Sequence, residues 1–109
     1  MTMKPGEFTQ NVWKLARTIP PGRVTTYGLL AVTAGGHPML SRMITAILSK
    51  APDADSMPWH RIVYSDGHVW LSPTYEKIRR KLYKQEGIKL DKNNKIIDFE
   101  KIIFLFDKR

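Results

Sequence analysis

The first part of the chain has the apolar spacing of one helix, followed by the capping signals of a second. A helix is predicted from about Glu7 to Thr18, because its apolar residues recur every three or four positions and Pro20–Gly22 interrupts the pattern. These apolar residues are Phe8, Val12, Leu15 and Ile19. Thr26 can then cap a shorter second helix that runs through Ala34, and Gly35-Gly36 suits its end.

A third helix can begin at Pro38, since proline suits the first helical turn. Its apolar residues form one stripe, which consists of Leu40, Met43, Ile44, Ile47 and Leu48. The rest of its surface is small and polar with one cation, and consists of Ser41, Arg42, Thr45 and Ser49. Two short helices joined by a glycine-containing turn, the second with an accessible polar face, predict a helix-turn-helix.

A β-hairpin is predicted next, because the apolar stretches Ile62–Tyr64 and His68–Trp70 flank the turn sequence Ser65–Gly67. A hairpin in this place resembles the wing of a winged helix-turn-helix. The pattern therefore predicts a mainly α fold with a small β-hairpin wing.

The last predicted helix runs from Ser72-Pro73 to Glu86, with Gly87 as its stop. Its cations are Arg79, Arg80, Lys81 and Lys84. Beyond Ile88, short apolar pieces alternate with a polar turn, and we expect one or two short strands or an extended segment docked on the body. We expect one domain over residues 1–109, with a core of about 8–88 and a C-terminal extension of 89–109.

Composition indicates a class of partner. The chain has 18 lysines and arginines, 10 aspartates and glutamates and a net charge of +8, which favours a polyanion such as nucleic acid over a merely solvated basic surface. With no cysteine, and with His37, His60 and His68 lacking the spacing of metal ligands, we expect no metal or other cofactor. No apolar run can cross a bilayer and Met1–Glu7 is unlike a signal peptide, so we expect a cytoplasmic protein without a membrane partner.

Four segments, in this order, resemble the C-terminal DNA-binding domain of the O6-alkylguanine-DNA alkyltransferases, over roughly residues 8 to 88. They are Ile19–Gly28, Arg42, Pro58–Val63 and Glu86-Gly87. The family's reactive tetrapeptide holds a nucleophilic cysteine, where this chain has Trp59. An indole can be neither deprotonated nor alkylated as a thiolate is, so the chain resembles the alkyltransferase-like proteins, which sense a lesion without processing it.

The resemblance implies how DNA would be bound. The helix-turn-helix enters the minor groove, Arg42 fills the gap left by a flipped guanine, and Tyr27 crowds the phosphate 3' to the target. Backbone amides beside Thr26 can bind a phosphate, and Ser41 and Thr45 complete the DNA-binding face. Thr45 stands where the family's recognition helix commonly has glycine.

The resemblance also implies a lesion pocket. Trp59 would lie where the reactive sulfur sits and form an apolar wall against the extruded base and its alkyl group. The other residues expected in this pocket are Leu48, Val69, Trp70 and Ser72. The family's Tyr-Ser-Gly loop, which closes over the base, is replaced by Ser72–Thr74, which suggests a more open pocket that accepts bulkier alkyl groups.

His60 and Glu86 match the base and the orienting carboxylate of the enzymes' catalytic relay. Without a thiol they activate nothing, so we expect a buried hydrogen bond that holds the tetrapeptide against the fourth helix. Arg61 is expected to be structural as well.

The leading hypothesis is a monomeric, non-enzymatic sensor. It would flip O6-alkylguanine in double-stranded DNA and mark the site for nucleotide excision repair proteins. One alternative is a winged-helix regulator that binds undamaged DNA, for which Trp59 would be unimportant. Another is a glycosylase that uses Asp66 or Glu86 to activate water.

Overall fold

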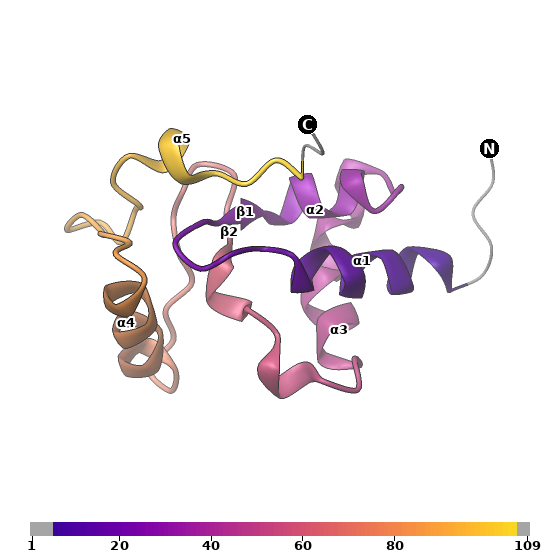
Figure 1. The fold of residues 1–109 in the computed structure, drawn as a ribbon, viewed down its shortest axis with the longest axis horizontal. Coiled ribbons are helices and arrows are strands. Elements are labelled where there is room, and N and C mark those ends of the chain that lie inside the picture. Colours follow the sequence, from indigo (N-terminus) through magenta and orange to yellow (C-terminus); the bar gives the residue numbers. More distant parts are fainter. Residues whose placement is uncertain (1–5, 107–109) are drawn as a thin grey trace.

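The computed structural model describes residues 6–106 and arranges mostly helical elements around a two-stranded sheet (Figure 1). Most of the Met1–Glu7 stretch, which we expect to be unlike a signal peptide, lies outside the described residues. In chain order the elements, with η for 3-10 helices, are α1 (Glu7–Arg17), β1 (Thr25–Thr26), α2 (Tyr27–Thr33), η1 (Pro38–Met43), α3 (Ile44–Ser49), η2 (Ala54–Ser56), η3 (Trp59–Arg61), β2 (Ile62–Val63), α4 (Glu76–Gln85) and α5 (Phe99–Ile102). The predicted mainly helical class is confirmed.

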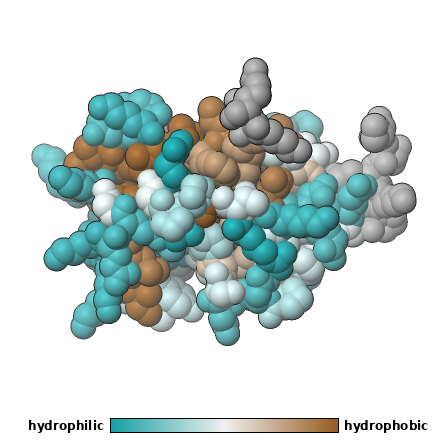
Figure 2. Space-filling model, in the orientation of Figure 1, coloured by the Kyte–Doolittle hydropathy of each residue, from teal (hydrophilic) through white to brown (hydrophobic). Residues whose placement is uncertain are grey.

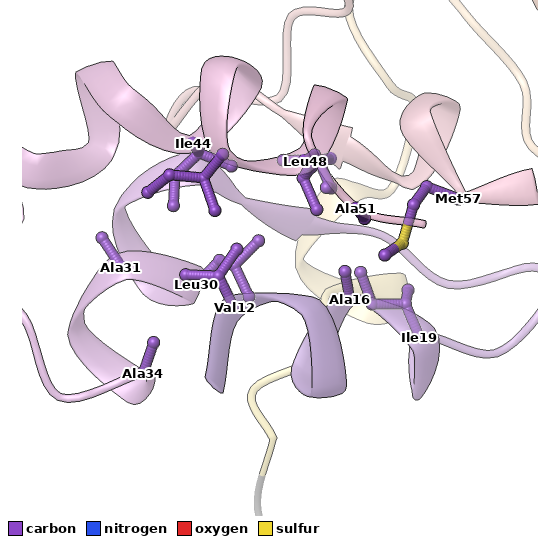
Figure 3. Close-up of a cluster of buried hydrophobic side chains, with 12 residues drawn as sticks. Val12, Ala16, Ile19, Leu30, Ala31, Ala34, Ile44, Leu48, Ala51 and Met57 are labelled. Atoms are coloured by element: carbon purple, nitrogen blue, oxygen red, sulfur yellow. The ribbon is translucent and has the colours of Figure 1, made fainter. Parts of the chain in front are cut away.

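A hydrophobic core lies where α1, α2 and α3 meet, and Figure 3 shows its side chains pointing toward one another. The residues of this core with no exposed surface are Val12, Ala16, Leu30, Ala31, Ile44 and Leu48. Burial stabilises such a cluster by about 25 cal/mol for each Å² of apolar surface removed from water. Gly36 lets the chain turn closely against α1, because a Cβ at this position would lie 2.6 Å from the Phe8 ring.

The predicted third helix consists of two segments with different winding. The 3-10 segment η1 has about three residues per turn and α3 has about 3.6, so the predicted apolar stripe does not stay on one face. Ile44, Ile47 and Leu48 are buried, whereas Leu40 is half-buried and Met43 is 51% exposed. The prediction that all five residues form one apolar stripe is therefore wrong for Met43, which lies off the buried face.

The sheet pairs β1 with β2 in parallel, with Thr25 opposite Ile62 and Thr26 opposite Val63. Ile62 packs into the helical core and Val63 into a second core, so both faces of β2 are covered, as is typical of parallel strands. This second core lies between the sheet, α4 and the C-terminal segment, and its buried residues are Val24, Val63, Val69, Tyr83, Ile88 and Ile96.

The predicted hairpin is present only as a turn. The Tyr64 amide donates to the His68 carbonyl at 3.0 Å, but the second arm then leaves the first. It pairs instead with the C-terminal segment, where His68 bridges Lys95 and the Val69 amide donates to the Asn94 carbonyl at 3.0 Å. The two arms therefore do not form the two-stranded hairpin ladder that the sequence predicted.

The last long helix, α4, begins at Glu76 and not at Ser72. Ser72 instead closes a turn, in which its hydroxyl accepts from the Tyr75 amide at 3.2 Å and its carbonyl accepts from the Glu76 amide at 2.8 Å. The helix ends at Gln85, one residue before the predicted Glu86, and Gly87 follows with a positive φ of 75°.

The C-terminal segment docks on the body, as predicted, but it contains the short helix α5, which was not predicted. Ile103 bridges Val24, and the aromatic rings of Phe104 and Phe106 pack against the helical core. Figure 2 shows hydrophobic surface where this segment crosses the molecule and hydrophilic side chains projecting around α4. Within residues 6–106, no helix has both the length and the apolar character needed to cross a membrane.

Leu48 and Met43 test the boundary of the core. We expect Leu48→Ala to lower the free energy of unfolding by about 2–5 kcal/mol, because it leaves a cavity between three helices. Met43→Ala should change it by less than about 0.5 kcal/mol, because this side chain is mostly exposed. Urea denaturation of both variants measures the two effects, and equal losses would contradict the assignment.

Candidate nucleic-acid interface

A groove of about 930 Å³ opens between the η1 and α3 segment on one side and α4 on the other. In Figure 1 these two walls lie on either side of the chain that contains residues 54–61. The first wall consists of Ser41, Arg42, Thr45 and Ser49. The second consists of Trp70, Tyr75, Ile78, Arg79 and Leu82. Between them lie Tyr27, Ala54, Asp55, Met57, Trp59, His60 and Tyr64.

Six of the expected DNA-binding and pocket residues line this groove. They are Tyr27, Ser41, Arg42, Thr45, Trp59 and Trp70. The helix-turn-helix, the tetrapeptide and the segment after the turn at residues 64–67 supply them, so the fold brings together positions up to 43 residues apart, from Tyr27 to Trp70. The groove therefore unites the part of the sequence expected to contact DNA with the part expected to hold the lesion.

Four expected residues do not line the groove, each for a local reason. Thr26 is buried, and its hydroxyl accepts from the Leu29 amide at 3.0 Å as the N-cap of α2. Leu48 points into the helical core, as Figure 3 shows. Val69 is buried in the second core, since it points away from its neighbour Trp70 in extended chain. Ser72 forms the turn before α4.

Trp59 is fixed in place at the floor of the groove. Its indole Nε1 donates to the Ala54 carbonyl at 2.8 Å, and its ring packs against the helical core. One part of the indole thus touches the body while another faces the groove.

Tyr27 and Arg42 differ in their surroundings. Tyr27 starts α2, and its ring centroid lies 5.7 Å from that of Tyr64. Burial raises the pKa of Tyr27, so its hydroxyl stays protonated and can donate. Arg42 is exposed in the last turn of η1 and has no hydrogen bond or ion pair with any residue of the described range 6–106. Its guanidinium is therefore available to a ligand.

Glu86 holds the tetrapeptide and α4 together. One of its carboxylate oxygens, Oε2, lies 2.6 Å from His60 Nε2 and 2.7 Å from Arg61 Nη2. The other, Oε1, accepts from the Gly22 amide at 2.9 Å. The hydrogen bond predicted between His60 and Glu86 is present, and Arg61 is structural, since it also donates to the Ile19 carbonyl at 3.0 Å.

The charges in this network follow from its hydrogen bonds. Burial disfavours ionisation of Glu86, but the hydrogen bonds from Arg61, Gly22 and His60 outweigh it and lower the pKa of Glu86 to about 2. Burial lowers the pKa of His60, against the opposing effect of Glu86. At neutral pH the ionised carboxylate can only accept, so a neutral His60 donates its Nε2 proton to it.

Neither carboxylate considered for a glycosylase is suited to act as a base. The Asp66 carboxylate accepts from the backbone amide of His68 at 3.0 Å and pairs with its ring at 2.7 Å, and these contacts lower the pKa of Asp66. Glu86 is held by Arg61 with a pKa of about 2. An efficient general base has a pKa nearer the working pH, so the site does not support this alternative.

Sequence reasoning missed the α4 wall of the groove. Tyr75, Ile78 and Leu82 lie three and four positions apart, which places them on one face of an otherwise basic helix. Tyr75 is 51% exposed and Ile78 is 58% exposed. An apolar stripe with no core to cover was the signal that could have identified this wall.

In the described part of the chain, no three side chains are arranged to bind a metal ion.

Comparison with known proteins agrees with the geometry. The family model described as "6-O-methylguanine DNA methyltransferase, DNA binding domain" matches residues 7–88. A "DNA base-flipping protein" of Escherichia coli (strain K12) is 33% identical over 93 residues, which cover 85% of this chain and 71% of that protein.

Solved structures show the same fold. The crystal structure of S. pombe Atl1 in complex with damaged DNA containing O6-carboxymethylguanine matches with a TM-score of 0.72 at 21% identity, over 94% of this chain and 98% of the other. The O6-methylguanine methyltransferase of Mycobacterium tuberculosis matches with a TM-score of 0.59 at 29% identity, over 73% of this chain and 48% of the other.

The solved structures show a winged-helix-like fold, and the family model identifies it as a DNA-binding domain. The chain belongs to the family of 6-O-methylguanine DNA methyltransferase DNA-binding domains, and within it to the alkyltransferase-like proteins.

The ionisation of Glu86 makes the free energy of unfolding depend on pH in the acidic range. Because folding lowers the pKa of Glu86 from 4.5 to about 2, its contribution is present above about pH 4.5 and is lost as the pH falls toward 2. We expect Glu86→Gln to lower the free energy of unfolding at pH 7 by about 3 kcal/mol and to flatten this acid dependence.

Glu76→Gln is the matched control, since Glu76 lies on the same helix in an exposed pair with Arg80. It should cost less than about 0.5 kcal/mol. Urea denaturation between pH 7 and pH 3 measures both variants. Parallel pH profiles for Glu86→Gln and the unmodified protein would contradict the network.

Proposed function

We propose that this protein is a non-enzymatic sensor of alkylated guanine in double-stranded DNA. It binds the minor groove through its helix-turn-helix, flips the modified guanine and holds it beside Trp59. The observation that carries the proposal is the single groove in which Tyr27, Arg42 and Trp59 meet. The net charge of +8 suits a polyanionic partner, and the relatives named for base flipping support the assignment.

Each residue has a physical task in this proposal. Arg42 enters the stack in place of the flipped guanine, because a guanidinium can both fill the gap and hydrogen-bond the orphaned cytosine. Tyr27, whose hydroxyl stays protonated, donates to a phosphate at the base of the flipped nucleotide. The Trp59 indole offers a flat apolar surface to the base and to its alkyl group.

The same site lacks the means to remove the alkyl group. The chain contains no cysteine, and the neutral His60 and ionised Glu86 hydrogen-bond each other with no thiol to activate. The lesion therefore stays on the DNA while the protein is bound. We propose that the occupied site marks the lesion for nucleotide excision repair proteins.

Arg42 tests base flipping. We expect the protein to bind a duplex with one O6-methylguanine more tightly than the matched unmodified duplex, and Arg42→Ala to reduce that preference about tenfold or more. Lys101→Ala removes one charge from α5, outside the groove, and should leave the preference unchanged. Fluorescence anisotropy measures all six affinities. Equal binding of both duplexes by the unmodified protein would favour a regulator that reads undamaged DNA.

Trp59 tests the lesion pocket. Since contact between a base and an aromatic ring contributes about 1–3 kcal/mol, Trp59→Ala should weaken binding of the modified duplex about tenfold to a hundredfold and that of the unmodified duplex far less. Trp13→Ala is the matched control, because the Trp13 indole also donates to a backbone carbonyl at 2.8 Å, that of Ile47, but does not line the groove.

Both tryptophan variants are compared at a temperature where thermal denaturation shows them folded. An equal loss of lesion preference in the two variants would assign the effect to packing and would contradict a pocket at Trp59.

A further inference from the structure

Arg79 is a buried cation that faces the groove. It lies on α4 and lines the groove, although the residue is only 8% exposed. Its guanidinium carbon lies 4.9 Å from the ring centroid of Trp70, and its Nη1 donates to the Trp70 carbonyl at 3.3 Å. The guanidinium is thus held against one wall by a cation–π contact and one long hydrogen bond to Trp70, and it also hydrogen-bonds the neutral hydroxyl of Tyr83.

No anion neutralises this cation within the described residues 6–106. The carboxylate that lines the groove, Asp55, is exposed and forms no ion pair with Arg79. Glu86 is occupied by Arg61, His60 and the Gly22 amide. A buried charge is normally paired, because its transfer out of water is costly.

The neighbouring hydroxyl groups do not supply the missing charge. Burial raises the pKa of Tyr83 to about 12, although Arg79 acts in the opposite direction. Burial also raises the pKa of Tyr27 against the effect of Arg79. Both side chains are neutral at physiological pH, so the guanidinium keeps donors for which the protein provides no anionic acceptor.

We infer that Arg79 determines adduct specificity, and that it binds the carboxylate of an O6 substituent on the extruded guanine. The inference rests on the proposed function. Trp59 stands at the family's alkyl-acceptor position and lines the same groove as Arg79, so the substituent and the guanidinium share one space. A guanidinium binds a carboxylate through two parallel hydrogen bonds, which a neutral group of the same shape cannot match.

Three duplexes of one sequence test this inference. The first carries O6-carboxymethylguanine, the second its neutral amide analogue O6-carbamoylmethylguanine, and the third unmodified guanine. We expect the protein to bind the carboxylate duplex about tenfold more tightly than the amide duplex. Arg79→Met, which keeps an unbranched apolar chain, should remove that difference, whereas Arg79→Lys should keep part of it.

Arg80→Met is the matched control. It removes the same charge from the next position of α4, where Arg80 is exposed and bonded to Glu76 and Asn94, so the preference for the carboxylate should persist. Because the unmodified protein is compared on two adducts of equal size, the test does not depend on a variant that folds. Anisotropy titrations at constant salt supply the affinities.

Two results would overturn the inference. The first is that the unmodified protein binds the carboxylate and amide duplexes with equal affinity. The second is a loss of the same factor on all three duplexes in Arg79→Met, which would place a backbone phosphate on Arg79. If neither modified duplex binds more tightly than the unmodified one, the proposed function itself fails. If both bind more tightly but equally, only the role of Arg79 fails.

Discussion

One ionised carboxylate organises the groove. Glu86 joins the end of α4 to the tetrapeptide through His60 and Arg61, and to the loop before β1 through the Gly22 amide. These segments are separated by as many as 64 residues in the sequence. This arrangement holds α4 against the tetrapeptide that lies between the two walls, so His60 and Glu86 have a structural purpose that does not need a thiol.

The groove differs from a general basic surface in how its cations are distributed. Arg42 is exposed on one wall, and Arg79 is buried in the other beside Trp70. Between them lies mostly aromatic and apolar surface, which includes Trp59 and Met57. An exposed cation can meet the DNA backbone or enter the base stack, whereas a buried one can act only on what enters the groove. On the proposed function, this distribution separates contact with the duplex from inspection of the base.

The sequence predicted the helices well and the groove in part. Apolar spacing was sufficient for α1, because its stripe faces one core, and the Thr26 cap with Gly35-Gly36 was sufficient for α2. It misplaced Met43, because a change from 3-10 to α winding shifts the face on which a side chain lies. It also placed Leu48 and Val69 in the groove, because a motif locates a residue along the chain but not the side to which it points. The α4 wall was missed because it forms only when α4 packs beside the tetrapeptide.

On the function proposed above, an indole in place of a thiol also changes the kinetics of the encounter with a lesion. With no bond formed between protein and adduct, every molecule that leaves a lesion is unaltered and can search again. The proposed signal to repair proteins is then set by the residence time on the lesion, which depends on the rate of dissociation. The hydrogen bond from Trp59 to the Ala54 carbonyl keeps the ring in one orientation before DNA arrives, so little rotational freedom is lost on contact.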